Sequence, residues 1–203
     1  MNILILTPGI LPDTYSGIPK ITYYLARELQ RAGHQVVIIT RQYKKEHVTH
    51  EIIEGMSYYR VPFPERWGPL NKIWPLTTPI QSRRWQKKIK ALYPKFDIVW
   101  VLNPWWTLLM NPKTLWPKAK IVSQFLVNPY DEIISNNGKT TTARAFGRLY
   151  NIVAKKEMKR SDFISSLSKY SQEDALSMVG IKYADKMIIV PGGVDMNCFN
   201  PPS

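Results

Sequence analysis

The sequence predicts a fold of the α/β class, with a mostly parallel sheet and helices on both of its faces. Short unbroken apolar runs such as ILILT and VVII are typical of strands that are covered on both sides. Apolar residues at helical spacing lie between these runs, and the alternation continues along most of the 203 residues. A chain of this length can bury the core of one full domain, so we expect a single Rossmann-like domain of three layers.

The first three elements form one strand–helix–strand unit. Residues 3–7 are an apolar strand, and apolar residues then recur every three or four positions over 18–32. Gly33 follows directly and is expected to end the helix, because glycine readily takes the left-handed conformation after a helical carboxyl terminus. Residues 36–39 give the second strand, so the unit predicts a right-handed βαβ crossover.

The later elements follow the same alternation. Gly180 is expected to end the last helix. Residues 1–196 then form the domain, and 197–203 begin an interdomain linker. Because ligands of such sheets bind at the carboxyl ends of the strands, we expect the site in the loops that follow them. The later strands are expected at 57–63, 97–102, 120–127, 163–166 and 187–190, and the later helices at 80–93, 142–160 and 169–179, with a short helix after 103–106.

The net charge of +13 is concentrated in two stretches. Residues 41–95 hold twelve Lys or Arg against four Glu, a net charge of +8, and residues 139–160 hold seven against one, a net charge of +6. Such patches suit an anionic partner, such as a phosphorylated ligand, anionic lipid headgroups or nucleic acid, or they are a solubilising surface. No recognised nucleic-acid-binding motif accompanies them, so nucleic acid is the least expected of these partners.

Composition also indicates the cellular location. The single cysteine, Cys198, excludes an internal disulfide framework and fits a reducing compartment. Asn2 stands where a secretory signal carries basic residues, and no apolar stretch approaches the roughly 20 residues that span a bilayer. We expect a cytoplasmic protein that can contact the inner face of a membrane peripherally.

The loop TPGILPDTYSGIPK, residues 7–20, is longer than a plain connector requires. It places Ser16 and Gly17 at the amino end of the first helix, where free N–H groups and the helix dipole favour an anion. The glycine spacing matches neither a dinucleotide fingerprint nor a Walker loop. The residues alone leave two interpretations open: Ser16 caps the helix, or Ser16 and Gly17 face a ligand.

The two ends of the chain carry motifs at compatible spacing. The amino end has a strand, a Pro-containing loop closing in Ser16-Gly17, a helix, Gly-His and the strand VVIIT. The carboxyl end has a strand ending in serine, a helix and MIIVPGGVDMNCFNPPS. Together they resemble glycosyltransferase family 4, in which the loop usually ends in Gly-Gly and the exit reads Pro-Asn-Gly-Val-Asp before Phe-x-Pro. Here Gly192 replaces that Asn, while the matching residues are Gly193, Val194, Asp195, Phe199 and Pro201.

The resemblance covers nearly the whole chain and implies the amino-terminal, acceptor-side half of a GT-B fold. Family members transfer a sugar from a nucleotide-sugar to an acceptor with retention of configuration and without a metal. Their second domain binds the nucleotide-sugar through a Glu-x7-Glu motif, and we expect this donor-binding domain to be absent from the chain. Glu46 and Glu54 have the motif's spacing but lack the family's glycine-rich context, so we do not assign them to it. No cofactor is therefore expected in this chain, and a nucleotide-sugar donor is expected for the complete enzyme.

The segment EHVTHEIIE, residues 46–54, also holds His47, His50 and Glu51, which can be drawn as metal ligands. The trio lacks the context of a zinc site, and we interpret it as a solvated connector, so no metal site is expected. Family members often place a histidine just after the strand that corresponds to KIVSQFLV. This chain has none there, and the catalytic base stays unassigned.

The resemblance places the acceptor side at the carboxyl ends of two strands. Trp rings stack on the apolar faces of sugars, and side-chain amides supply directional hydrogen bonds. The alternative for the two tryptophans of NPWW is that they begin a buried helix, and we expect one of them to serve each purpose. The candidate acceptor-binding residues are Asn103, Trp105, Trp106, Asn128 and Asp131.

The helix expected over 80–93 combines an apolar face for packing on the sheet with a basic outer face. The basic face meets solvent alone, or it meets anionic lipid, in keeping with the lipid-linked acceptors of many family members. The candidate residues facing a membrane or another anion are Arg83, Arg84, Lys87, Lys88 and Lys90.

The resemblance therefore implies the acceptor-binding domain of a retaining glycosyltransferase that acts on a glycan or a lipid-linked acceptor. Such a domain is expected to be inactive without a donor-binding domain. The alternative is a non-catalytic module that binds an anionic membrane or a separate donor-domain chain.

Overall fold

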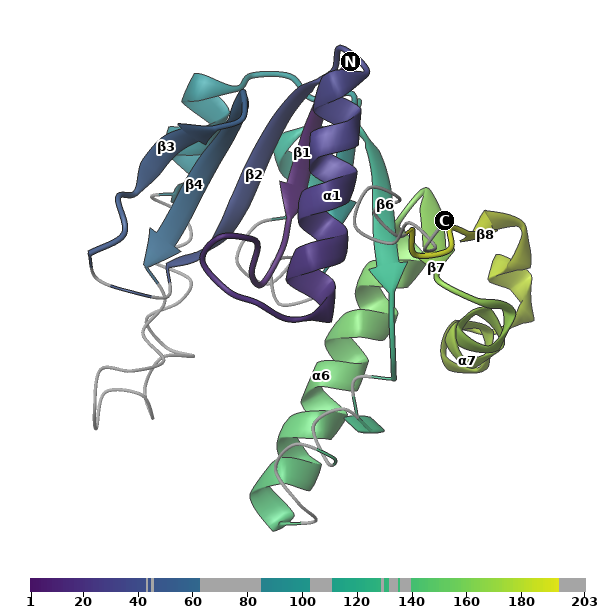
Figure 1. Cartoon of the computed structure of the whole chain (residues 1–203). Coiled ribbons are helices and arrows are strands. Elements are labelled where there is room, and N and C mark those ends of the chain that lie inside the picture. Colours follow the sequence, from purple (N-terminus) through teal and green to yellow (C-terminus); the bar gives the residue numbers. More distant parts are fainter. Residues whose placement is uncertain are drawn as a thin grey trace, which may run out of the picture.

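The computed structural model of the chain describes residues 1–42, 44, 46–62, 85–102, 111–128, 130–131, 135 and 140–193. These residues form a sheet of eight strands in the order β3-β4-β2-β1-β5-β6-β7-β8 (Figure 1). Every pairing of neighbours within it is parallel except that of β3 with β4. The predicted α/β fold with a mostly parallel sheet is confirmed.

Most of the expected elements are present, with ends that differ by at most three residues. Of the helix expected over 80–93, residues 85–92 are helical, and residues 80–84 lie outside the described part of the chain. The strands are β1 (Asn2–Leu6), β2 (Gln35–Gln42), β3 (His50–Ile53), β4 (Met56–Pro62), β5 (Ile98–Val101), β6 (Lys120–Phe125), β7 (Phe163–Ser166) and β8 (Met187–Ile189). The labelled helices are α1 (Gly17–Arg31), α4 (Pro112–Leu115), α6 (Thr141–Arg160), α7 (Lys169–Val179) and the 3-10 helix η3 (Ile181–Lys186).

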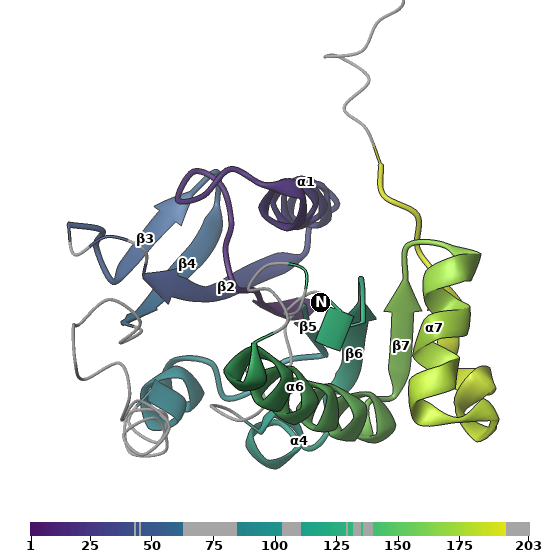
Figure 2. The same ribbon diagram turned by 90° about the horizontal axis from the view of Figure 1, so that it is seen from below.

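Helices cover both faces of the sheet, which gives the three expected layers. Figure 2 shows α1 on one face, and α4, α6 and the helix at residues 85–92 on the other. Alternate residues of β1 enter the two cores: Ile3 and Ile5 pack in the cluster under α1, and Leu4 and Leu6 pack in the cluster that holds Ile89. Because β1 is buried on both faces, its sequence is a continuous apolar run.

The hairpin of β3 and β4 corrects one interpretation. The segment 46–54 was expected to be a solvated connector, but His50–Ile53 pairs antiparallel with β4 at the edge of the sheet. Glu54 and Gly55 form the two-residue turn, with φ of 48° and 79°. Positive φ at both central residues is the geometry of a type I′ turn, which matches the twist of the two strands.

Glycine ends α1 and α7 as expected. Gly33 has φ of 82° and Gly180 has φ of 101°, values that residues with a Cβ rarely adopt. At the other end of α7, Ser168 and Ser171 form a reciprocal capping box. Local residue choices therefore fix the carboxyl ends of both helices and the amino end of α7.

Asp162 joins the chain between α6 and β7 to the start of β6. Its Oδ2 accepts hydrogen bonds from the Ile121 N–H at 2.8 Å and from Lys113 Nζ at 2.7 Å. Burial by itself would raise the pKa of Asp162, but these two donors outweigh it and hold the pKa below its ordinary value of 3.8. The ionised carboxylate is thus the form that stabilises this corner of the fold.

We predict that Asp162→Asn removes part of the acid sensitivity of the protein. A depressed pKa in the folded state adds stability above the unfolded-state value near 3.8, and this stability disappears as the pH falls through the folded-state pKa. Denaturant unfolding between pH 3 and pH 7, values set by that ordinary pKa, should show a smaller loss toward low pH in the variant. Asp185→Asn, an exposed aspartate of η3, is the control. An unchanged acid profile in Asp162→Asn would contradict the assignment.

Candidate functional site

The order of the strands in the sheet reverses direction at β1. The chain leaves β1 for β2 on one side, and later returns to β5 on the other side of β1. In an open parallel sheet, ligands bind outside the carboxyl ends of the strands at the point where the order reverses. The loop that follows β1, residues 7–16, leaves the sheet at this edge, which lies at the bottom of Figure 1.

The first half of this loop is anchored on the sheet. Thr7 is fully buried, and its Oγ1 donates to the carbonyl of Gly9 at 2.8 Å. Ile10 is also fully buried and packs with Ile3 and Ile5. The N–H of Thr14 donates to the carbonyl of Ile10 at 3.2 Å. A loop held in this way has a defined shape when it reaches α1.

A buried ion pair fixes the second half of the loop. Arg60 of β4 and the Asp13 side chain are each only 2% exposed. Arg60 Nη2 donates to Asp13 Oδ1 at 2.8 Å and Nε donates to Oδ2, so the pair is bidentate. Arg60 Nη1 also donates to the Val48 carbonyl at 3.2 Å, and Glu51 completes the set of anionic partners. The loop is therefore tied to a strand that lies two positions away in the sheet.

Electrostatics keep this arginine charged despite its burial. Desolvation by itself lowers the pKa of Arg60, but the hydrogen bonds to Asp13 and Glu51 outweigh it and raise the pKa. His47 lies at the edge of the same cluster, with Nδ1 at 3.7 Å from Asp13 Oδ1. Sequence reasoning missed the pair, although an arginine between buried tyrosine and valine in SYYRV indicates a buried partner.

The amino end of α1 faces open space. Ser16 precedes the helix in extended conformation, and its side chain makes no capping hydrogen bond, so the capping interpretation is wrong. Pro19, the third helical residue, has no N–H to donate to a cap. A Cβ placed on Gly17 would meet no atom of the described residues within 4 Å. The N–H groups of Gly17 and Ile18 lack intrahelical partners because they belong to the first turn.

The exit segment after β8 comes back to α1. The N–H of Val190 donates to the Ser166 carbonyl at 2.8 Å, which extends the pairing of β8 with β7. A Cβ on Gly192 would lie 3.9 Å from Ile21 Cδ1 of α1. Gly192 of the Pro-Gly-Gly segment is thus a neighbour of the first helix, while residues 194–203 lie outside the described part.

The candidate acceptor residues are only partly described. Asn103, Trp105 and Trp106 lie outside the described residues. Asn128 is half-buried, and its Oδ1 accepts a local hydrogen bond from the Tyr130 N–H at 3.1 Å. Asp131 is exposed.

Neither Asn128 nor Asp131 is joined to Ser16 or Gly17 by a hydrogen bond or ion pair. Tyr130, which lies between these two residues in the sequence, packs against α6 instead. A Cβ on Gly147 would lie 2.9 Å from Tyr130 Cδ2, so the absence of a side chain at Gly147 lets Tyr130 approach the helix.

The basic helix has the predicted two faces over the residues that are described. Ile89 is fully buried in the core, while Lys87, Lys88 and Lys90 are exposed. Lys88 Nζ lies 5.1 Å from the centre of the Trp85 ring. Arg83 and Arg84 lie outside the described residues.

The histidines of segment 46–54 have other contacts. His50 stacks on Tyr59 with ring centres 4.3 Å apart, and Glu51 pairs with Arg60. Among the described residues, no group of three His, Cys, Asp or Glu side chains is placed to hold a metal. Within the same part of the chain, no helix has the length and apolar character needed to cross a bilayer.

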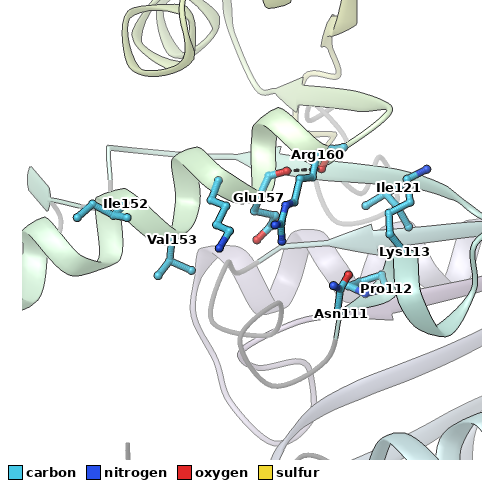
Figure 3. Close-up of a pocket in the computed structure, with 10 residues that line it drawn as sticks. Asn111, Pro112, Lys113, Ile121, Ile152, Val153, Glu157 and Arg160 are labelled. Atoms are coloured by element: carbon cyan, nitrogen blue, oxygen red, sulfur yellow. Dashed lines mark hydrogen bonds between the residues drawn. The ribbon is translucent and has the colours of Figure 1, made fainter. Parts of the chain in front are cut away.

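A cavity of about 280 Å³ lies between α6 and the start of α4 (Figure 3). Ile121, the second residue of β6, contributes to its lining together with Pro112 and Val153. Because Ile121 is near the amino end of its strand, the cavity lies away from the carboxyl edge that holds Ser16 and Gly17. It is a feature separate from the predicted cleft.

Solved structures resemble the fold over its whole length. Sucrose-phosphate synthase from Thermosynechococcus elongatus matches with a TM-score of 0.69 and 15% identity, covering 99% of this chain and 50% of that chain. The catalytic domain of starch synthase IV from Arabidopsis thaliana, bound to ADP and acarbose, matches with a TM-score of 0.61 and 14% identity, covering 100% and 53%. The chain thus spans about half the length of both. A second structure of the synthase from T. elongatus matches at 0.59 and 15% identity, over 98% of this chain and 92% of that one.

No curated protein matches the chain by sequence. The sequence model of Glycosyltransferase Family 4 matches residues 15–197, which is most of the chain. The sheet order, the helices on both faces and the structural neighbours agree with a Rossmann-like domain of GT-B glycosyltransferases. The chain belongs to glycosyltransferase family 4.

Proposed function

We propose that the chain is the acceptor-side domain of a retaining glycosyltransferase, which transfers a sugar from a nucleotide-sugar to a glycan or a lipid-linked acceptor. The exposed amino end of α1 at the carboxyl edge of the sheet is the observation that carries the proposal. Membership of the family supports transferase chemistry. One structural neighbour was solved with ADP, a nucleoside diphosphate, which is the leaving group that such a reaction releases.

Ser16 and Gly17 would lie against the donor phosphates. The N–H groups of Gly17 and Ile18 and the positive end of the helix dipole stabilise negative charge at this point. Charge on the diphosphate grows as the bond to the sugar breaks, so donors held in place by a rigid loop favour the transition state over the ground state. The Asp13–Arg60 pair supplies that rigidity. We propose that the transfer proceeds without a metal ion, and the catalytic base remains unassigned.

The acceptor would enter from the loops that follow β5 and β6. β5 pairs directly with β1, and β6 is the next strand, so both loops leave the sheet on the same edge as residues 7–16. The residues proposed for this side are Asn103, Trp105, Trp106, Asn128 and Asp131.

The exposed Lys87, Lys88 and Lys90, with Arg83 and Arg84 before them, would direct the domain to anionic lipid. A cytoplasmic enzyme held peripherally at the inner face of the membrane would meet a lipid-linked acceptor there.

The experiment is a transfer assay with purified chain, nucleotide-sugars of several bases and glycan or lipid-linked acceptors. We expect no product from the 203 residues alone, because GT-B neighbours use about twice this length. Sugar transfer that appears only when a donor-binding domain of the family is added would support the proposal. Turnover by the isolated chain would contradict the proposed need for a second domain.

A non-catalytic module that binds an anionic membrane or a separate donor-domain chain is the second candidate. The basic surface favours this candidate, because the three exposed lysines of the helix at 85–92 can bind an anionic surface without any part in catalysis. Membrane or partner binding that persists while every domain combination fails to transfer sugar would favour this module over the enzyme.

A further inference from the structure

Helix α6 has an outer surface whose composition the proposed chemistry does not explain. Its charged residues are six cations and one anion, and the anion, Glu157, is buried and accepts a hydrogen bond from Ser123 Oγ at 2.8 Å. The exposed charges of the helix are therefore all positive. Five of the cations are exposed and Lys159 is half-buried; the six are Arg144, Arg148, Lys155, Lys156, Lys159 and Arg160.

Large apolar side chains lie on the same surface. Phe146, Leu149 and Ile152 are 40%, 50% and 64% exposed. They follow one another at a spacing of three, so they form one strip along the helix rather than scattered positions. By the same helical spacing, Lys155 and Lys156 lie one turn beyond Ile152. An exposed apolar strip with cations beside it is the pattern of a helix that lies in a membrane interface.

The cavity between α6 and α4 continues this strip. Ile152 and Val153 line it from α6, and Pro112 and Ile121 give it an apolar floor (Figure 3). Lys156 and Arg160 also line it, and neither forms an ion pair with another residue of the described part of the chain. Lys113 at its rim is already paired with Asp162 at 2.7 Å. An apolar hollow with two unpaired cations suits the boundary between lipid headgroups and acyl chains.

The described helix of the first basic stretch, residues 85–92, and α6 of the second lie over the same face of the sheet. Figure 2 shows α6 and the helix at 85–92 on the face opposite α1. Figure 1 shows that α6 also reaches beyond the carboxyl ends of the strands. Lys87, Lys88 and Lys90 can therefore contribute to the same electrostatic attraction as the cations of α6.

We propose that the outer surface of α6 docks on an anionic bilayer, with Leu149 and Ile152 entering the interface and the flanking lysines and arginines contacting headgroup phosphates. Charge complementarity selects this occupant, because the exposed charges of α6 are all positive. The inference deepens the proposed membrane-facing role of the domain and rests on it. It places the main contact on α6 rather than on residues 83–90.

The test is sedimentation of the purified chain with vesicles of phosphatidylcholine, with and without phosphatidylglycerol. We expect binding only to the anionic vesicles. Leu149→Ser with Ile152→Ser should lower the partition coefficient about tenfold or more, because two apolar side chains no longer insert into the membrane interface. Lys155→Glu with Lys156→Glu should weaken it at least about tenfold, because two headgroup contacts become repulsive.

Matched controls distinguish specific binding through α6 from non-specific effects of net charge and of exposed apolar side chains. Lys169→Glu with Lys182→Glu makes the same change in net charge on α7 and η3, and Tyr170→Ser with Ile181→Ser removes apolar side chains that are 81% and 80% exposed. Both controls should bind like the wild-type chain. Circular dichroism and thermal unfolding show whether each variant remains folded, which is expected because all eight positions are exposed.

Several results would contradict the assignment of a membrane-docking surface to α6. Binding to neutral vesicles as strong as to anionic ones, equal losses in the control variants, or no vesicle binding would each contradict it. No vesicle binding together with salt-sensitive binding to random DNA would assign the cations to a different polyanion. Loss of binding in Lys87→Glu with Lys88→Glu, while the α6 variants bind normally, would leave the proposed membrane role intact and refute α6 alone. If the vesicle assays give the expected results but no domain combination transfers sugar, the docking surface on α6 is supported and the proposed transferase activity is refuted.

Discussion

Replacing Asp13 by alanine is expected to lower the free energy of unfolding by about 3 kcal/mol or more, since it leaves Arg60 buried without its bidentate partner. The full size of a buried pair applies here because both side chains are 2% exposed, so solvent screens them little. Glu51 remains as a partner but is 36% exposed. Denaturant unfolding with an unchanged m-value measures the loss.

The same substitution should release the loop before α1. Amide hydrogen exchange of residues 8–16 is expected to rise more than that of β1, because the loop loses its tie to β4. Glu51→Gln is the control and should cost below about 1 kcal/mol, as exposed ion pairs do. Asp13→Leu combined with Arg60→Met should recover part of the stability, since no unpaired charge stays buried. An unfolding free energy of Asp13→Ala equal to that of the wild-type chain would show that the pair does not hold the loop.

Replacing Gly17 by valine is expected to separate binding from stability. The position is exposed, and a Cβ there meets no atom within 4 Å in the part of the chain that the structure describes. The free energy of unfolding should therefore change by less than about 0.5 kcal/mol. The branched side chain would occupy the space in front of the N–H groups of Gly17 and Ile18. Weak binding of nucleoside diphosphates, followed by calorimetric titration, should therefore be lost.

The matched control for this variant is Gln35→Val, which adds the same side chain at an exposed position on the opposite edge of the sheet. It should bind like the wild-type chain. Equal diphosphate affinity in wild type and Gly17→Val would remove the amino end of α1 from the donor site.

The sheet could be predicted because its central strands are buried on both faces. β1 and β2 appear in the sequence as unbroken apolar runs, and the glycines after α1 and α7 occupy positions with positive φ. β3 escaped prediction because it is an edge strand with alternately exposed and half-buried residues and no apolar run. Its one local signal is Glu54-Gly55, whose turn geometry needs a residue that tolerates positive φ.

The site could be placed from the order of the elements but not described in detail. Ser16 and Gly17 fall at the start of the first helix after the first strand, so the carboxyl edge of the sheet follows from the fold alone. The Asp13–Arg60 pair depends on the register of β4 beside β2 and on the path of the loop from residue 7. These are tertiary features that no local pattern encodes. The acceptor residues 103–106 lie outside the described part, and their assignment stays a prediction.

We propose that the loop after β1 and the amino end of α1 form the phosphate-binding side of a donor site. The most direct measurement is a titration of the isotope-labelled chain with UDP, GDP, ADP and inorganic pyrophosphate, followed by NMR at each backbone amide. We predict that the largest shifts occur at Ser16, Gly17 and Ile18 for every diphosphate. No shifts at any of them, or the largest shifts at the α6–α4 cavity around Lys156 and Arg160, would contradict it.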